Sequence, residues 1–386
     1  MRWLIACDKF KEALSAQEVC EQIALGLQQA DTLSAFSIDC CPLSDGGDGF
    51  LQVMHKAVGG EWQRSACHDA LLQPHEAMWL WLPNEQTAFI EVAAAAGLAA
   101  IPAGRRNPHQ SSSYGVGELI RAAVKQGARH IYVGIGGSAS HDLGLGLAAA
   151  LGVRFFNAQQ KTFIPTAHTL QQIERVEVPG VLIPPHCRIE AICDVQNPLV
   201  GNEGAAFTYA LQKGFRQEEL SQLEAHTQQA VNCLASACPQ ARTIAQQTGS
   251  GAGGGIAFGL AVFLGAPLTA GVAWIAEKVG FARRLQQADI VITGEGKLDN
   301  QSRFGKVTHF VGHEAQKQGK LCAVFCGSCE LSISGNHPYD YVCSILPAPM
   351  SLEEALAQTA DHLHAAAFQF GKLMTNGKLR SLLLKK

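Results

Sequence analysis

Glycine-rich turns, three of which also carry acidic residues, are the feature that most constrains the fold of this chain. They lie at Ser44–Gly49, Gly134–Gly146, Thr248–Gly255 and Thr293–Lys306, next to apolar runs typical of buried strands or helices. Glycine allows the backbone to direct its N–H groups toward an anion at close range. Carboxylates in the same turns can hold a magnesium ion or accept a proton. Together they indicate phosphoryl transfer rather than nucleotide binding alone.

Strand-like runs alternate with helix-like runs along most of the sequence, which is typical of α/β proteins. A strand at Trp3–Cys7 is followed by a helix at Ser15–Ala30, where Ser15 and Glu18 form a capping box. Further helices are predicted at Gly49–Val58, Tyr114–Gln126, Gln217–Ser236, Gly255–Leu264, Val307–Gln318 and Leu352–Met374. Further strands are predicted at Ser37–Leu43, Glu61–Cys67, Ala77–Leu82, Ala88–Ala94, His130–Ile135, Arg188–Val195, Asp289–Thr293, Leu321–Cys326 and Tyr341–Leu346.

A change of pattern after Gly60, from strand–helix alternation to a meander of short strands, predicts two α/β domains. A chain of 386 residues is long for a single core. We expect an open parallel-sheet domain of the Rossmann or flavodoxin type from residues 1–65 and 286–386, with a second α/β domain, 66–285, inserted in it. The active site is expected in the cleft between them, where the carboxyl ends of parallel strands bind ligands.

Composition excludes several partners. The net charge is −3 and only 16% of residues are charged, so the chain has no excess of positive charge with which to bind nucleic acid. No apolar run is long enough to span a membrane, and the apolar start is too short for a signal peptide. The thirteen cysteines, an odd number, indicate reduced thiols and a cytoplasmic protein. The oligomeric state stays open, and a homo-oligomer is compatible with the sequence.

Two motifs leave alternatives to phosphoryl transfer. The runs Gly134–Ala139 and Gly249–Gly254 match a dinucleotide fingerprint, but neither is followed by the required acid at the end of a second strand. A dehydrogenase is therefore disfavoured. The pair Cys326 and Cys329 forms a CxxC motif, for which thiols packed beside a turn are favoured over a redox centre. The sequence contains no Walker A loop, protein-kinase signature, serine nucleophile elbow or HExxH zinc motif.

Three acidic turns follow predicted strands. In the first, Asp8 can accept a proton or bind magnesium, and Lys9 or Lys11 can reach a phosphate or a carboxylate. The second turn carries Asp45 and Asp48, and the third carries Glu295 and Asp299. Each turn taken alone is equally well explained as a solvated or tight turn. Three such turns at strand ends favour a common site.

These segments resemble the type 1 glycerate kinases, bacterial enzymes that phosphorylate D-glycerate with ATP. The resemblance runs from residue 1 to about residue 330, with a weaker tail, and consists of seven motifs in the family's order. The matching segments are Cys7–Ala16 (CDKFKEALSA), Ser44–Phe50 (SDGGDGF), Arg106–Ile120 (RNPHQSSSYGVGELI), Gly134–Gly146 (GIGGSASHDLGLG), Asp194–Ala205 (DVQNPLVGNEGA), Gly249–Gly255 (GSGAGGG) and Asp289–Lys306 (DIVITGEGKLDNQSRFGK). The main departures are Lys9 for Ser, Asp48 for Glu, and Ser140 and His141 for Thr and Asn.

The resemblance implies an ATP- and Mg²⁺-dependent kinase that converts D-glycerate to 2-phosphoglycerate in organic acid catabolism. Phosphorylation of the 3-hydroxyl stays an alternative, because that group is one carbon away in the same substrate. The second alternative is a non-catalytic homologue that binds a nucleotide or a hydroxy acid. In the kinase, a carboxylate accepts the proton of the attacking hydroxyl while magnesium and a lysine neutralise the developing charge.

Residue roles follow from the matched motifs. Asp45 and Asp194 are the candidate bases, with Lys11 as the catalytic cation and Glu295 and Asp299 as metal ligands or alternative bases. Asp8, Arg106 and Lys213 are expected to bind the substrate. The residues expected to bind phosphate are Gly136, Gly137, Ser138, Gly251, Gly253, Gly254 and Lys306. Helix capping is an equally good role for two further acids, Glu91 and Asp142.

Overall fold

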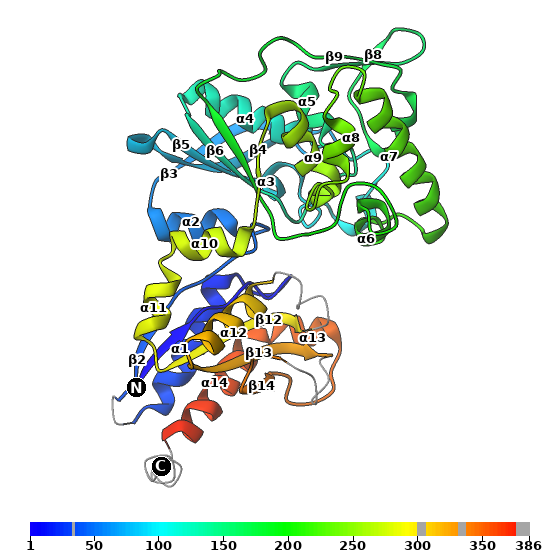
Figure 1. Ribbon diagram of the computed structural model, residues 1–386. Coiled ribbons are helices and arrows are strands. Elements are labelled where there is room, and N and C mark those ends of the chain that lie inside the picture. The colour runs from blue at the N-terminus through cyan, green and yellow to red at the C-terminus, as the bar shows by residue number, and fades with distance from the viewer. Residues whose placement is uncertain (33–34, 299–305, 331–336, 376–386) are drawn as a thin grey trace. The chain divides into compact units, whose positions relative to one another are not determined.

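The computed structural model describes residues 1–32, 35–298, 306–330 and 337–375 (Figure 1). The chain divides into two compact units, Met1–Asp45 with Val272–Lys386, and Gly46–Gly271. Both are α/β units built on largely parallel sheets, as expected. Both boundaries of the inserted unit fall earlier in the chain than the sequence pattern suggested, because helix α2 (Phe50–Val58) packs on strands of the inserted unit and helix α11 (Phe281–Gln287) on a strand of the other.

The first unit contains an open five-stranded sheet in which all strands are parallel. Its strand order is β14-β13-β12-β1-β2, so the two strands from the start of the chain lie beside three strands from its end. The strands are β1 (Arg2–Ile5), β2 (Ser37–Cys40), β12 (Ile290–Leu298), β13 (Leu321–Cys329) and β14 (Tyr341–Ser344). Because the strands are parallel, the turns that follow them meet at one edge of the sheet.

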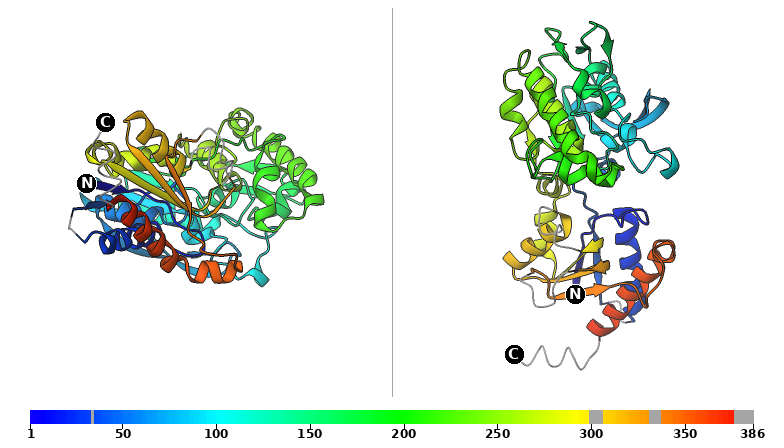
Figure 2. Two further views of the ribbon diagram at one scale, coloured as in Figure 1. Left: turned by 90° about the horizontal axis from the view of Figure 1, so that it is seen from below. Right: turned by 90° about the vertical axis from the view of Figure 1, so that its right-hand side faces the viewer.

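Helices cover both faces of this sheet (Figure 2). Helices α1 (Ala16–Ala30) and α14 (Thr359–Thr375) pack together on the face formed by Trp3, Ile5 and their neighbours. Helices α11 and α12 (Val307–Lys317) lie on the opposite face. The predicted capping box at Ser15 is present at the start of α1. The remaining helices in this part of the chain are α10 (Gly271–Lys278) and α13 (Leu352–Ala357).

The second unit contains a six-stranded mixed sheet of order β11-β10-β6-β5-β4-β3. Strands β3 to β5 form the predicted antiparallel meander, and β5, β6, β10 and β11 are parallel. The strands are β3 (Glu61–His68), β4 (Pro74–Leu82), β5 (Thr87–Glu91), β6 (His130–Gly134), β10 (Arg188–Ile192) and β11 (Leu268–Thr269). Helices α4 (Tyr114–Gln126) and α9 (Ala252–Leu264) share one core with this sheet, which holds the turns after β6 and β10 in fixed positions.

A small three-stranded antiparallel sheet lies in the same unit and was not predicted. It consists of β7 (Arg154–Phe156), β8 (Thr162–Phe163) and β9 (Arg175–Glu177). Its inner residues join a second core with helices that pack behind the glycine-rich turns. The other helices of the unit are α3 (Val92–Ala96), α5 (Leu145–Ala150), α6 (Ala205–Lys213), α7 (Leu220–Leu234) and α8 (Ala241–Ala245).

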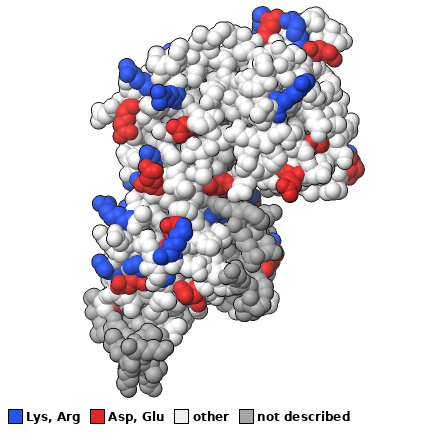
Figure 3. Space-filling view, in the orientation of Figure 1, with Lys and Arg blue, Asp and Glu red and all other residues white. Residues whose placement is uncertain are grey.

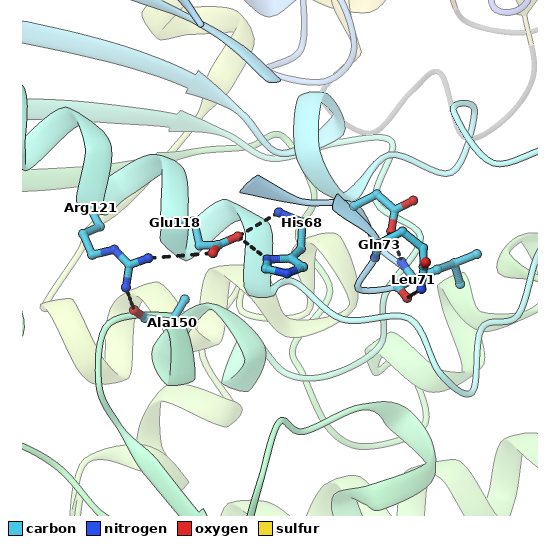
Figure 4. Close-up of polar contacts among 7 residues, drawn as sticks. His68, Leu71, Gln73, Glu118, Arg121 and Ala150 are labelled. Atoms are coloured by element: carbon cyan, nitrogen blue, oxygen red, sulfur yellow. Dashed lines mark hydrogen bonds and ion pairs between the residues drawn. The ribbon is translucent and has the colours of Figure 1, made fainter. Parts of the chain in front are cut away.

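A polar network ties the β3–β4 hairpin to the helices behind it (Figure 4). The Glu118 carboxylate on α4 accepts hydrogen bonds from the backbone N–H of His68 at 2.7 Å and from its Nδ1 at 2.9 Å. Arg121 pairs with the same carboxylate at 3.7 Å and donates to the Ala150 carbonyl at 3.0 Å. One largely buried carboxylate therefore joins β3 and α4 directly, and Arg121 extends the connection to α5.

Three further observations bear on the partners expected from composition. On the face shown in Figure 3, lysine and arginine side chains stand in small groups mixed with acidic ones. Among the described helices, none combines the length and the apolar character needed to cross a bilayer. The thirteen cysteines all lie among the described residues, where none forms a disulfide, and Cys326 and Cys329 lie within the single strand β13.

Candidate functional site

Three carboxylates gather at the carboxyl edge of the first unit's sheet. Asp8 follows β1, Asp45 follows β2, and Glu295 lies near the end of β12. These three strands are neighbours in the order β12-β1-β2, so their ends present the acids side by side. The backbone N–H of Asp8 donates to the Gly294 carbonyl at 3.2 Å, which fixes the first turn against β12.

The electrostatics of Asp8 reflect this crowding. Burial raises the pKa of Asp8 to about 7, and the carboxylates of Asp45 and Glu295 act in the same direction while the Lys9 ammonium opposes them. Lys9 Nζ lies 3.9 Å from Asp45 Oδ1. A carboxyl group with a pKa near neutrality can hold or release a proton under physiological conditions, as acid–base chemistry requires. Lys9, where the resembling family has serine, therefore pairs with an acid of the site.

Glu295 is held by two residues at the start of α12. The Thr308 hydroxyl donates to Glu295 Oε1 at 2.5 Å, and Lys306 Nζ lies 3.4 Å from Oε2. Lys306 thus contacts a predicted metal ligand, and Thr308 was missed because nothing in its sequence context distinguishes it from an ordinary helix residue. Lys11 is exposed in the turn after Phe10. Asp299, the second predicted metal ligand, lies outside the described residues.

A magnesium ion would find few protein ligands here. Among the described residues, no group of three or more His, Cys, Asp or Glu side chains is placed to hold a metal by itself. Mg²⁺ commonly binds through one or two carboxylates, with phosphate and water oxygens completing its shell. The residues present fit an ion of that kind, which arrives with a phosphate, rather than a resident metal in a protein cage.

The turn after β6 in the second unit offers backbone donors. The N–H groups of Gly136, Gly137, Ser138, Ser140 and His141 have no acceptor in the described part of the chain. Gly137 is exposed, with φ +61°. Buried or half-buried amides are rarely left without a partner in native proteins. A run of such donors around an exposed glycine is the arrangement that binds an anion such as phosphate.

Most backbone N–H groups of the second glycine-rich turn, at Gly249–Gly255, already donate to carbonyl oxygens. The N–H of Gly251 donates to the Asn197 carbonyl at 3.1 Å, and that of Gly254 to the Gly251 carbonyl at 3.2 Å. Only Gly253, of the three glycines predicted here, has an N–H without an acceptor among the described residues, and it is also less buried than the other two. Gly254 instead leaves room for the Lys213 side chain, since a Cβ atom added to Gly254 would lie 2.7 Å from Lys213 Nζ.

Lys213 joins the two turns from the end of α6. The side chain is buried, and Nζ donates to Ser138 Oγ at 2.9 Å and to the Ser140 carbonyl at 2.5 Å. Burial lowers the pKa of Lys213 to about 7, against a smaller opposing effect of the Asp142 carboxylate. The predicted phosphate-binding Ser138 is thus in direct contact with the predicted substrate-binding Lys213.

His141 does not face solvent. It is fully buried, and its Nε2 lies 3.3 Å from the Thr227 hydroxyl, which donates to the Leu223 carbonyl. The hydroxyl can therefore only accept from His141, so we assign the hydrogen to Nε2, and Nδ1 has no partner among the described residues. Burial, followed by the nearby Lys213, lowers the pKa of His141 to about 3. The side chain is neutral and packs inward.

Two acids have the capping roles considered for them. Glu91 accepts the N–H groups of Gly49 and Leu51 at 3.2 Å each, at the start of α2. Asp142 is fully buried and accepts the N–H of Ser113 at 2.6 Å and the N–H of Gly146 at 3.2 Å. Both carboxylates satisfy helix amides, which confirms the structural interpretation of these residues.

Asp194 and the Gly136 turn lie at the same edge of the second unit's sheet. Arg106 contacts neither Asp194 nor that turn through its described hydrogen bond. Asp194 is half-buried, two residues beyond β10, and β10 pairs with β6. The Ile135 N–H donates to the Ile192 carbonyl at 2.9 Å, which ties the two strand ends together. Arg106 is exposed and donates through Nε to the Ile101 carbonyl at 3.2 Å. The structure thus groups Asp194, the Gly136 turn and Lys213 in one unit, and the three acids in the other.

The chain is similar to known proteins along its whole length. The family model described as the glycerate kinase family matches residues 3–375. The glycerate kinase of Bacillus cereus is 34% identical over 374 residues, covering 95% of this chain and 96% of that protein. The glycerate 2-kinase of Escherichia coli K12 is 32% identical, with the same coverage. A solved structure from Salmonella typhimurium LT2, described as a candidate glycerate kinase 2, aligns with a TM-score of 0.78 at 32% identity, covering 98% of this chain and 99% of that one.

Proposed function

Because the chain belongs to the glycerate kinase family, we propose that it transfers the γ-phosphoryl group of ATP to the 2-hydroxyl of D-glycerate. The product is 2-phosphoglycerate, Mg²⁺ accompanies the nucleotide, and the reaction serves organic acid catabolism. The observation that carries the proposal is the turn Gly136–His141, whose acceptor-free amides lie in a segment that resembles a motif of the family and within the residues that the family model matches. That turn supplies the donors that a phosphate group needs.

The phosphate side of the reaction needs positioning and charge neutralisation more than covalent chemistry. The amides of Gly136, Gly137 and Ser138 would bind phosphate oxygens, and Gly253 adds one further donor. Lys306 is half-exposed next to Glu295 and can turn toward an anion. Donors fixed before the substrate binds stabilise the charge that develops in the transition state without further reorganisation.

The acceptor side of the reaction needs a carboxylate that takes the hydroxyl proton as the oxygen attacks phosphorus. Asp194 and Asp45 remain the candidates for this base, one in each unit. Lys9 Nζ lies 3.9 Å from the carboxylate of Asp45. Asp8, with a pKa of about 7, is able to receive the proton from a neighbouring group. A cation such as Lys11 would bind the carboxylate of glycerate.

The experiment that tests the function is a phosphorus NMR assay of the purified protein with ATP, Mg²⁺ and D-glycerate. We expect the ATP signals to be replaced by those of ADP and 2-phosphoglycerate. A 3-phosphoglycerate signal would correct the position of transfer and leave the kinase activity intact. Protein that binds ATP or glycerate without turnover would indicate a non-catalytic homologue and contradict the proposal.

Separate Asp45→Asn and Asp194→Asn variants identify the base. Whichever carboxylate accepts the proton, its loss lowers kcat by on the order of a hundredfold or more. The other variant changes turnover less, and the comparison assigns the role. Equal and full activity of both variants would remove both residues from the chemistry.

A further inference from the structure

The carboxylate of Asp48 lies directly against the turn with the unpaired amides. A Cβ atom added to Gly137 would lie 1.8 Å from Asp48 Oδ1 and 2.9 Å from Oδ2. A Cβ added to Gly136 would lie 2.3 Å from the Cα of Gly47. The turn at Gly46–Gly49 and the turn at Gly136–Gly137 therefore stack backbone against backbone, and glycine at positions 136 and 137 allows the acid to come so close.

Asp48 has none of the partners that a buried carboxylate oxygen usually has. Its Oδ1 is shielded from solvent and receives no hydrogen bond from the described residues. The obvious structural role would be to cap α2, which begins at Phe50. That role is already filled, because Glu91 accepts the amides of Gly49 and Leu51. The acid is therefore not explained by the local fold.

An unpaired carboxylate beside an anion-binding turn is electrostatically unfavourable once the anion arrives. The carboxylate and a phosphate group on the Gly136–His141 turn would be neighbouring negative charges with little water between them. Like charges in partly buried sites repel strongly unless a cation lies between them. A divalent ion carried by the nucleotide removes this repulsion and uses the free carboxylate oxygen as a ligand.

We propose that Asp48 is the protein ligand for the magnesium ion of the metal–nucleotide complex, so that the turn accepts Mg²⁺-complexed nucleotide and discriminates against the free nucleotide. This inference rests on the proposed function. It assigns a metal ligand in the second unit, a residue different from the two ligands predicted from the sequence, Glu295 and Asp299. The resembling family has glutamate at this position, which carries the same charge on a longer side chain.

The test is the affinity for a non-hydrolysable ATP analogue, measured by calorimetry with Mg²⁺ and with a chelator. The wild-type protein should bind the analogue at least tenfold more tightly with Mg²⁺. Asp48→Asn keeps the size of the side chain and removes its charge. It should bind the free analogue more tightly than wild type does, and gain less than about threefold from Mg²⁺. Asp48→Glu should keep the wild-type dependence on the metal.

Matched controls separate this inference from the function on which it rests. Glu76→Gln removes a surface carboxylate, paired with Arg64 at 3.4 Å, and should leave the metal dependence unchanged. An Asp48→Asn variant with the same gain from Mg²⁺ as wild type overturns the inference alone. Should that variant not fold, equal affinity of the wild type with and without Mg²⁺ overturns it as well. No binding of the analogue by wild type in either condition contradicts the proposed function itself.

Discussion

The Lys213 amine lies in the protein interior with two oxygen acceptors, and it forms no ion pair with the described residues. Its pKa in the folded protein is about 7, below the ordinary 10.5. Between these values the unfolded chain binds a proton that the folded protein lacks, so this residue makes stability rise with pH. From pH 7 to pH 9 we expect wild type to gain about 2 kcal/mol relative to Lys213→Met, measured by urea unfolding.

The difference between wild type and variant isolates this group, because remote titrating residues contribute equally to both proteins and burial, the main cause of the low pKa of His141, is unchanged by the substitution. Well below pH 7, Lys213 is protonated in both the folded and the unfolded protein, and the difference in stability should be constant. A difference that is flat across the whole range from pH 6 to pH 10 would mean that the folded lysine keeps its ordinary pKa.

Adding a single methyl group at Gly137 should disturb the turn that we propose binds phosphate. Its φ of +61° disfavours any side chain, and an added Cβ collides with the Asp48 carboxylate. We expect Gly137→Ala to weaken binding of an ATP analogue by at least tenfold, measured by calorimetry. Gly104→Ala is the control, since a Cβ there meets nothing within 4 Å and its φ is not positive. Equal affinity of the two variants would place nucleotide binding elsewhere.

At the scale of single elements, Glu118 fastens the β3–β4 hairpin to α4 through two hydrogen bonds from His68 and a pair with Arg121. Its side chain is only 11% exposed, so its loss leaves the His68 donors without an acceptor in a region largely shielded from solvent. Glu118→Ala should lower the free energy of unfolding by about 2 kcal/mol, measured in urea.

The control for this substitution is Glu76→Ala on the neighbouring strand. Glu76 pairs with Arg64 at 3.4 Å, but both side chains are more than 60% exposed. Exposed pairs of this kind contribute about 0–1 kcal/mol. If the two alanine variants lose the same stability, the Glu118 network does not support the hairpin as described.

The sequence predicted most elements because their apolar periodicity is local. The capping box at Ser15 and the meander of β3 to β5 follow from residues close together in the chain. Strands of two or three residues, as in β7 to β9, are too short to show a period. The helix predicted at Leu352–Met374 is two helices, α13 and α14, that meet at Gln358 without a glycine or proline to signal the break.

The candidate site was predictable at the level of turns but not of atoms. Each glycine turn was found from its motif, yet the amides that are free depend on distant acceptors. The Gly251 amide is used by the Asn197 carbonyl, and nothing in the sequence near Gly251 indicates that contact. Likewise, the closeness of Asp48 to Gly137 depends on how two turns stack. Such contacts between segments far apart in the chain need the fold itself.

At the scale of the whole molecule, each unit has its own hydrophobic core. One core joins β1, β12 and β13 with α1 and α14, all in the first unit. Two others lie entirely within Gly46–Gly271, around the mixed sheet and behind the glycine turns. The second unit is also one continuous stretch of chain, whereas the first is assembled from both ends of the sequence. This difference predicts different behaviour when the chain is cut.

A fragment of residues 46–271 should fold alone, because both cores and all of its sheet strands come from within it. We expect near-ultraviolet circular dichroism of a fixed core and one cooperative urea transition. A fragment of residues 1–45 is the control: it contains only β1, β2 and α1, and two strands with one helix bury too little apolar surface for a stable core. A long fragment that unfolds gradually, like the short one, would mean that the inserted unit depends on the rest of the chain.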